Sequence, residues 1–181
     1  VWQFILEAKG MRHSATVSYR IQKIFKKSVP KMDGLTPRDT LPGIKDEQYY
    51  LARIKLESKN LDNYNALGSY YLDRENFIEA QNVYEYLINH DPASSEYYAK
   101  AGYCKLRQNL FAEAVNFYEK SLVLDSSHPN RFYNLALAHQ GSGKIGLALE
   151  ASRKALVLEP GNAKYQQILE DLQHALAETE K

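Results

Sequence analysis

Cysteine and tryptophan are nearly absent from the sequence, with one residue of each in 181. The single thiol, Cys104, cannot form an internal disulfide and cannot supply a metal site that needs several cysteines. The five histidines contain no pair four residues apart, the spacing that holds a metal ion on one helix face. The sequence therefore predicts no bound metal and no cofactor. It favours a reducing compartment, although a buried thiol in the periplasm would give the same composition.

Complete catalytic motifs are also missing. The stretch 141–144, Gly-Ser-Gly-Lys, looks like the end of a phosphate-binding loop, but that loop needs Gly at position 138 and Ser or Thr at 145. The chain has Ala138 and Ile145 there, so we interpret 141–144 as a turn between two helices. Cys104 has no histidine at a diagnostic spacing and is expected to be a buried packing residue. The chain is therefore not expected to be an enzyme.

Long hydrophobic runs are absent, because no eighteen consecutive residues are apolar enough to span a bilayer. Residues 1–6, Val-Trp-Gln-Phe-Ile-Leu, nevertheless lead directly into Lys9 and Arg12. An interfacial aromatic residue followed by basic residues is typical of the cytoplasmic end of a transmembrane helix. We expect either a membrane anchor upstream of Val1 or, alternatively, a short amphipathic capping helix or a trimmed chain. The predicted location is the cytoplasm, either free or at the cytoplasmic face of a membrane.

The net charge of +1 hides an asymmetry. Residues 1–45 carry nine Lys and Arg against three Asp and Glu, whereas residues 46–181 carry fourteen against nineteen. A basic arm on an acidic body can bind an anionic lipid surface, bind an acidic partner, or solvate a capping helix. Nucleic acid is not favoured, because no aromatic residues alternate with the basic ones. The predicted contact residues are Arg12, Arg20, Lys23, Lys26 and Lys27.

The strongest positive signal is self-similarity with a period of 34 residues. Gly68, Gly102 and Ala136 follow this spacing, and three further registers repeat it: Ala80, Ala114 and Ala148; Tyr64, Tyr98 and Phe132; Leu67, Ala101 and Leu135. The pattern predicts one helix, a short turn and a second helix in each repeat. Small residues let the paired helices approach closely, and Tyr84 and Tyr118 are expected to pack beside them. Prolines 92 and 160 are expected to end repeats, and Pro129 to open one.

These residues resemble the tetratricopeptide repeat family, whose pattern asks for aromatic, Leu, Gly, Tyr, Ala, aromatic, Ala and Pro at fixed offsets. The first repeat has Tyr64, Leu67, Gly68, Tyr71, Ala80, Tyr84 and Pro92. The second repeat departs from the pattern at Ala101, Lys105, Ser121 and Ser126, and the third at Ala136 and Ser152. The resemblance implies an all-α fold, a right-handed α-solenoid of helix-turn-helix repeats with an N-terminal helical extension and a C-terminal capping helix.

We divide the chain into five parts. Residues 1–32 form the basic helical extension, 33–45 a Pro/Gly linker, 46–60 a helix before the repeats, 61–160 the three repeats (61–94, 95–128 and 129–162), and 163–181 the capping helix. The extension is expected to hold a helix over 14–27. The cap continues the helical spacing with many polar positions, as the end of a repeat array requires.

By resemblance to the family, the first helices of the repeats line a concave groove for a peptide. The groove positions are the second, fifth, ninth, twelfth and thirteenth of each repeat. The residues predicted to bind peptide are Asn65, Ser69, Leu72, Tyr103, Leu106, Arg107, Asn130, Tyr133 and Leu137. Aromatic and aliphatic side chains edged by amides suit a peptide with apolar anchors. The alternative is that these side chains pack on neighbouring helices, or that another element covers them.

One family subtype, which clamps the C-terminal carboxylates of chaperones, is not favoured. It needs Lys and Asn in the first repeat, Asn in the second, and Lys with Arg in the third. This chain offers Asn65 and Ser69, then Lys100, then Asn130 and Asn134 at those positions. Four of the five positions therefore lack the required charge or amide.

The predicted function is a non-catalytic scaffold that binds a protein or peptide partner in the groove, with association with a membrane left open. Two alternatives remain. In the first, the repeats serve as the docking arm of a larger enzyme or membrane protein. In the second, the chain assembles with copies of itself to form a homo-oligomer. The fold does not choose among these roles.

Overall fold

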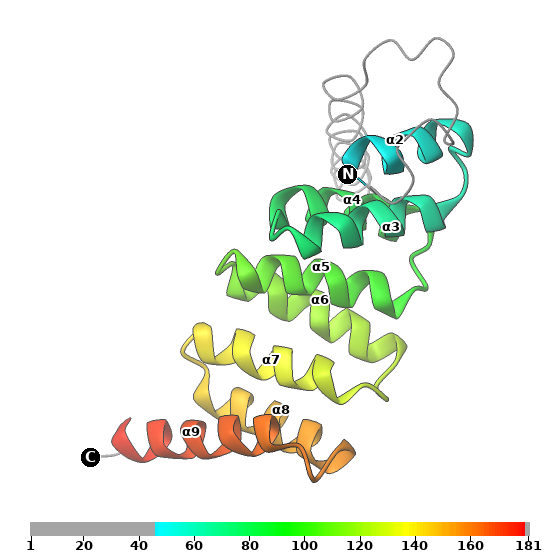
Figure 1. Cartoon of the computed structure of the whole chain (residues 1–181). Coiled ribbons are helices and arrows are strands. Elements are labelled where there is room, and N and C mark those ends of the chain that lie inside the picture. Colours follow the sequence, from blue (N-terminus) through cyan, green and yellow to red (C-terminus); the bar gives the residue numbers. More distant parts are fainter. Residues whose placement is uncertain (1–45, 180–181) are drawn as a thin grey trace, which may run out of the picture. The chain divides into compact units, whose positions relative to one another are not determined.

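The structure is a computed structural model that describes residues 46–179. The extension predicted over 1–32, its contact residues Arg12, Arg20, Lys23, Lys26 and Lys27, and the linker over 33–45 lie outside the described residues. Within 46–179 the chain is all-α, as predicted, and its helices pack in consecutive pairs (Figure 1).

The helices of the described residues follow one another with short connections. They are α2 (Glu47–Leu56), α3 (Leu61–Asp73), α4 (Phe77–His90), α5 (Ser95–Arg107), α6 (Phe111–Leu124), α7 (Pro129–Gly141), α8 (Ile145–Leu158) and α9 (Ala163–Thr179). Asp46 caps α2 by accepting a hydrogen bond from the Tyr49 amide at 3.0 Å. Pro129 occupies the first turn of α7, where its missing amide proton is not needed.

The same turn recurs in all three helix pairs. Glu75, Asn109 and Gly143, each 34 residues apart, have left-handed backbone conformations with φ of 55°, 59° and 72°. In the third turn the Lys144 amide donates to the His139 carbonyl at 2.9 Å and the Gly143 amide donates to the Gln140 carbonyl at 2.9 Å. This is a Schellman cap, which satisfies the last carbonyls of α7. The stretch 141–144 is therefore a helix end, as the sequence predicted.

The described chain forms two compact units, one ending at Pro92 and the other beginning at Ala93. The first unit contains α2, α3 and α4, and the second contains α5 to α9. In the first unit α3 packs against both α2 and α4. In the second unit each helix packs against the next one along the chain, and α5 also contacts α7.

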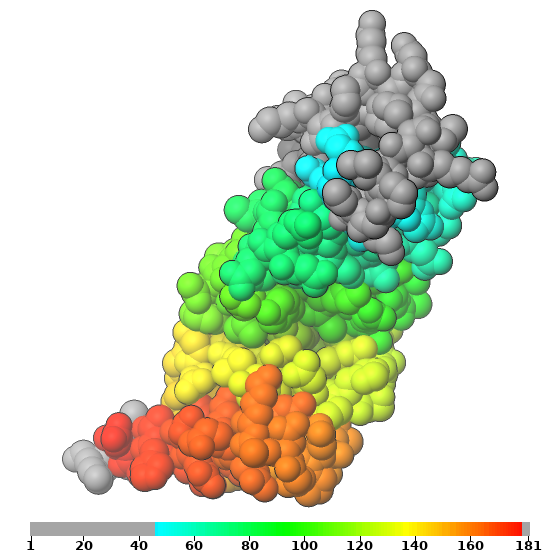
Figure 2. Space-filling view, in the orientation of Figure 1, coloured from blue at the N-terminus to red at the C-terminus, as the bar shows by residue number. Residues whose placement is uncertain are grey.

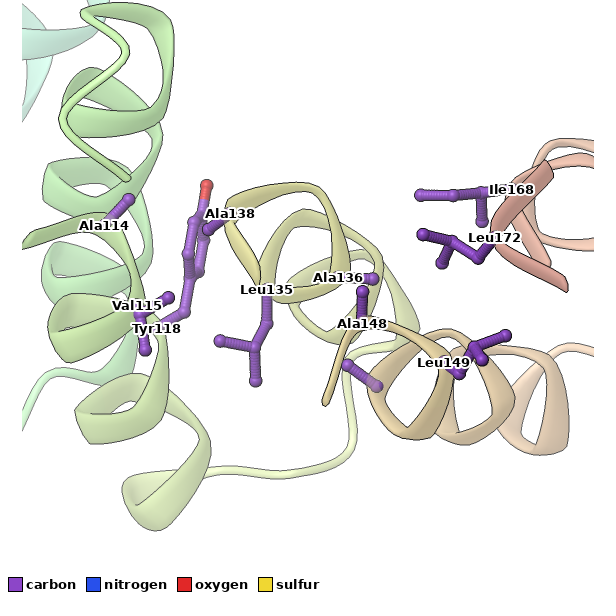
Figure 3. Packing of buried hydrophobic residues seen from close by; sticks show 11 residues of the cluster. Ala114, Val115, Tyr118, Leu135, Ala136, Ala138, Ala148, Leu149, Ile168 and Leu172 are labelled. Atoms are coloured by element: carbon purple, nitrogen blue, oxygen red, sulfur yellow. The ribbon is translucent and has the colours of Figure 1, made fainter. Parts of the chain in front are cut away.

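The core of the second unit lies between α6, α7, α8 and α9 (Figure 3). Alanines at 114, 136, 138 and 148 have no exposed surface, so the helix backbones come close together there. The Tyr118 ring extends from α6 toward α7 and is also fully buried. Cys104 is buried in α5, as expected.

Residues 46–179 contain no helix with the length and hydropathy that a membrane span requires.

Candidate functional site

The predicted groove residues fall into two groups, one in each unit. Asn65, Ser69 and Leu72 lie on α3 in the first unit. The other six lie in the second unit, with Tyr103, Leu106 and Arg107 on α5 and Asn130, Tyr133 and Leu137 on α7. In the first unit the Ser69 hydroxyl lies 3.2 Å from the Tyr84 hydroxyl and is therefore engaged within its own repeat.

In the second unit, an open cavity of about 460 Å³ lies on the surface formed by α5, α7 and α9. Figure 2 shows side chains of these three helices following one another on one face, from green through yellow to red. The cavity is lined by Glu96, Ala99, Lys100, Tyr103, Tyr118, His128, Asn130, Arg131, Asn134 and Lys164. It contains two of the predicted groove residues, Tyr103 and Asn130.

A second open cavity of about 380 Å³ contains three more of the predicted residues, Leu106, Arg107 and Leu137. On α5, the lining residues of the two cavities follow one another at spacings of three and four residues, from Glu96 to Arg107. Residues with this spacing share one face of a helix. The two cavities therefore follow the same stripe of α5.

Among the six predicted residues of the second unit, Tyr133 is the one that lines neither cavity. Its ring packs on the buried Tyr165 ring of α9, with centroids 5.4 Å apart, and the Lys164 ammonium lies 4.0 Å from the centre of the Tyr133 ring. Tyr133 is half-buried and, with Tyr103, Leu106 and Leu137, packs against the core of the second unit. These four side chains thus pack against the core and also form part of the surface. The predicted groove role and the alternative, packing on neighbouring helices, therefore apply to them together.

The first cavity has a positive electrostatic environment. Glu96 forms an ion pair of 2.8 Å with Lys100 in the next helical turn. The hydrogen bond from Lys100 holds the pKa of Glu96 below its usual value, and the charges of Arg131 and His128 act in the same direction. Arg131 is itself held by Asp125, at 3.3 Å between the ionic atoms. A carboxylate in this cavity is therefore stabilised in its charged form.

Tyr118 belongs to the cavity although the sequence indicated only a packing role. Its side chain has no exposed surface, and its hydroxyl has no hydrogen-bond partner among the described residues. Burial raises the pKa of the Tyr118 phenol well above its usual range, nearby Cys104 and Tyr103 add to the rise, and Asn134 opposes it. The signal in the sequence was Tyr103, which stands one period after Ser69. The second repeat therefore lacks the serine hydroxyl that Tyr84 contacts in the first repeat.

Lys164 is not among the predicted groove residues, because the sequence predicts a capping helix over 163–181. Glu96, Asn130 and Lys164 are each 34 residues apart, and all three line the first cavity. Extending the repeat register beyond residue 162 would have placed Lys164 in the groove. The helix α9 thus supplies one wall of the site.

A third cavity of about 560 Å³ lies between α6, α7 and α8. Its lining is mainly apolar and includes His139, which is buried and whose Nδ1 has no hydrogen-bond partner among the described residues. Residues 46–179 contain no group of three or more His, Cys, Asp or Glu side chains placed to hold a metal ion.

Comparison with known proteins gives a match for one of the repeats. A family model described as tetratricopeptide repeat matches residues 95–128, the second of the repeats read from the sequence. No curated protein matches the sequence.

Solved structures match the fold. MamA (residue 41 to its end) from Desulfovibrio magneticus RS-1 has a TM-score of 0.70 at 16% identity, over 91% of this chain and 85% of that one. The first tetratricopeptide repeat domain of Spaghetti (RPAP3), bound to the HSP90 peptide SRMEEVD, has a TM-score of 0.64 at 22% identity, over 66% and 95%. The second such domain of human RPAP3, in complex with the HSP70 peptide SGPTIEEVD, has a TM-score of 0.59 at 23% identity, over 61% and 92%.

Proposed function

We propose, since this chain is a tetratricopeptide-repeat protein, that it is a non-catalytic module that binds a peptide segment of another protein along α5, α7 and α9 of its second unit. The observation that carries the proposal is the pair of cavities along one stripe of α5, which together contain five of the six groove residues predicted there. Structurally similar repeat domains bind short peptides, which supports this class of ligand.

The surface has the chemistry that a peptide site needs. Tyr103, Leu106 and Leu137 provide half-buried apolar area, which contributes binding free energy when a ligand side chain covers it. The Arg107 guanidinium donates to the Tyr103 hydroxyl at 2.8 Å, and the exposed Asn130 amide can pair with a peptide backbone. An apolar strip with fixed polar groups at its edge gives both affinity and orientation.

Panning of a random peptide library on the purified chain tests the proposal. Affinities of the selected peptides are then measured by fluorescence anisotropy for the wild type, for Arg107→Glu in the second cavity, and for Arg153→Glu. Arg153 is exposed on α8 and lines neither cavity of this surface, so it is a matched control for the charge reversal.

We expect Arg107→Glu to weaken the selected peptides by about tenfold or more, equivalent to ~1.4 kcal/mol, while Arg153→Glu leaves affinity unchanged. Both variants should have wild-type helix content, because both side chains are exposed. Equal affinity of the two variants would show that the peptides bind elsewhere on the chain.

A further inference from the structure

We infer that the first unit has a docking surface on α2, formed by Tyr49, Tyr50 and Arg53, and that the basic segment 14–27 of the same chain occupies it. We refer to these three residues as the α2 surface and to residues 14–27 as the extension segment. The extension segment lies outside the described residues, and the sequence predicts a helix there. This inference concerns the first unit and does not depend on the peptide site proposed for the second unit.

The repeat register makes α2 the second helix of a pair. Tyr50 stands one period before Tyr84 and two periods before Tyr118. Each of these two tyrosines packs on a glycine in the first helix of its own pair, Gly68 for Tyr84 and Gly102 for Tyr118. The helix that would be the first of the pair with α2 is not among the helices of the described chain. The α2 surface therefore has the repeat position of the faces that join the other helix pairs, and its own partner lies elsewhere.

The burial of α2 indicates that its surface is covered. Leu51 and Ile54 are each 1% exposed, and α3 is the described helix against which α2 packs. None of the eight consecutive residues 47–54, which span more than two turns, is fully exposed. In contrast, α9, the last described helix, has exposed residues in every turn. A helix that packs on one neighbour has an exposed side, so a further segment covers α2.

The covering segment comes from the chain before α2, since that chain is joined to this helix. The residues next to α2 contain Pro37 and Pro42, which do not fit the interior of a helix. The extension segment is the nearest upstream stretch with helical periodicity. The 18 residues over 28–45 span up to about 60 Å when extended, whereas a 14-residue helix is about 21 Å long. The linker thus lets the extension segment lie along α2 in either direction.

The extension segment has an apolar side and a basic side. Its apolar side chains follow one another at spacings of three and four residues, and they are Val17, Ile21, Ile24 and Phe25. Its charged residues are all basic, and they are Arg20, Lys23, Lys26 and Lys27. A partner surface for this segment must therefore accept both apolar groups and cations.

Aromatic rings on and beside the α2 surface can accept both. The Tyr49 and Tyr50 ring centroids lie 5.2 Å apart, and the Tyr50 and Tyr70 centroids also lie 5.2 Å apart. Tyrosine rings bury apolar side chains and attract cations to their faces. Arg74 already shows the second interaction, with its guanidinium carbon 3.8 Å from the centre of the Tyr70 ring.

The charge of the first unit favours a basic partner. Residues 46–92 carry four Lys and Arg against nine Asp and Glu, whereas residues 93–181 carry ten against ten. The net negative charge outside the extension and linker thus lies in the first unit. Two of its carboxylates are close to the contact between α2 and α3, because the Tyr71 hydroxyl donates to Glu47 at 2.5 Å and the charge of Glu79 also acts on Tyr71. A segment with four cations and no acidic residue is complementary to this unit.

Two substitutions in the extension segment test the inference in the full-length chain. Ile21→Asp places a negative charge on the apolar side, and Gln22→Asp places the same charge one residue further along, outside that side. Hydrogen–deuterium exchange of the α2 amides is the readout, and exchange of the α9 amides is the reference.

We expect the α2 amides to exchange about tenfold faster or more in Ile21→Asp, because α2 opens more readily once the covering segment is released. Gln22→Asp should exchange like the wild type, and the α9 rates should be the same in all three chains. Equal α2 exchange in the two variants, at the wild-type rate or faster, would overturn the inference.

A second measurement needs no variant. In a chain with ¹³C-labelled isoleucine methyl groups, we expect nuclear Overhauser effects between the methyl groups of Ile21 or Ile24 and the ring protons of Tyr49 or Tyr50. A mixed sample, in which the labelled methyl groups and the protonated tyrosine rings are on different chains, should lack them. Absence of these effects from the first sample would also overturn the inference.

Other occupants give other results. Effects seen in the mixed sample would assign the α2 surface to the extension segment of a second copy and would overturn the contact within one chain. Anionic lipid would be the partner instead if wild-type α2 exchanged as fast as in Ile21→Asp and the extension segment were protected only with phosphatidylserine-containing vesicles. The proposed peptide site is tested separately by Arg107→Glu, so its failure and the failure of this inference are distinguishable.

Discussion

A Cβ atom added to Gly68 would lie 2.7 Å from Cζ of Tyr84, which is closer than carbon atoms approach without displacement. The Tyr84 ring is fully buried and has no room to move away. Alanine favours a helix over glycine by about 1 kcal/mol, but overpacking a close contact costs about 1–3 kcal/mol. We expect Gly68→Ala to lower the free energy of unfolding by up to about 2 kcal/mol in chemical denaturation.

Gly102→Ala is the matched comparison in the second unit. The added Cβ would lie 3.2 Å from Phe117 Cβ and from Tyr118 Cε2, a tight contact that a small shift can relieve. The gain in helix propensity then offsets the strain, so we expect a change within about 0.5 kcal/mol of zero. A larger loss for Gly102→Ala than for Gly68→Ala would contradict the packing described here.

The left-handed turn residues give a second prediction. Gly143 has a φ of 72°, and a Cβ added there would meet nothing within 4 Å, so Gly143→Ala tests backbone strain alone. A non-glycine residue in this conformation costs about 1–2 kcal/mol, and we expect a loss of about 1 kcal/mol in thermal or urea unfolding. Asn109 has the same conformation one repeat earlier, with a φ of 59°.

Asn109→Gly should change stability by only a few tenths of a kcal/mol, because asparagine tolerates the left-handed region and glycine adds flexibility to the unfolded chain. If Gly143→Ala and Asn109→Gly had effects of the same sign and size, conformational strain at these turns would not be the cause.

Much of the fold could be predicted because its determinants are local and periodic. The 34-residue spacing set the order of helices and turns, and the small residues Gly68 and Gly102 correctly indicated close contact with Tyr84 and Tyr118. The exceptions are positions where one repeat departs from the pattern. Lys105, which replaces an aromatic residue, is buried and forms an ion pair of 2.6 Å with Glu113.

The candidate site was harder to predict, because it depends on contacts between helices rather than on position within one repeat. Whether Tyr118 has a partner depends on the residue at 103, and whether Tyr133 faces outward depends on the aromatic ring at 165. A repeat register assigns faces of single helices. It does not show which side chain of the next helix covers each face. The contribution of α9 to the site was therefore not predicted.

Tyr133 provides a third prediction, since it links the surface to the fold. Its ring packs on Tyr165, which is 4% exposed, and under the Lys164 ammonium. Tyr133→Ala removes this aromatic contact and leaves a gap, so we expect a loss of about 2–3 kcal/mol in urea unfolding. Tyr133→Phe keeps the ring and should stay within about 0.5 kcal/mol of the wild type.

Binding experiments should therefore avoid Tyr133→Ala, because it changes stability and surface together. If Tyr133→Ala had wild-type stability, this ring would not pack on α9 in solution. Tyr133 would then be a purely exposed residue of the groove.

His139 gives a prediction about pH. It is buried on α7, and burial lowers its pKa because the imidazolium form loses hydration; Lys144 acts in the same direction, whereas Glu119 and Glu150 oppose it. The pKa of His139 is thus lower in the folded state than its value of about 6.5 in an unfolded chain. Below about pH 6.5 the unfolded state binds more protons, so the free energy of unfolding decreases as the pH falls toward the folded-state pKa.

Urea unfolding from pH 7.5 down to pH 5 measures this effect while staying above the range in which Glu96 and Asp125, whose pKa values are lowered, become protonated. We expect the wild type to lose stability across this range and His139→Gln to lose less, since glutamine does not titrate. His174→Gln, on an exposed position of α9, is the control and should follow the wild type. If His139→Gln kept the full pH dependence, another group would be responsible, and His139 would be accessible to water despite its position between α6 and α8.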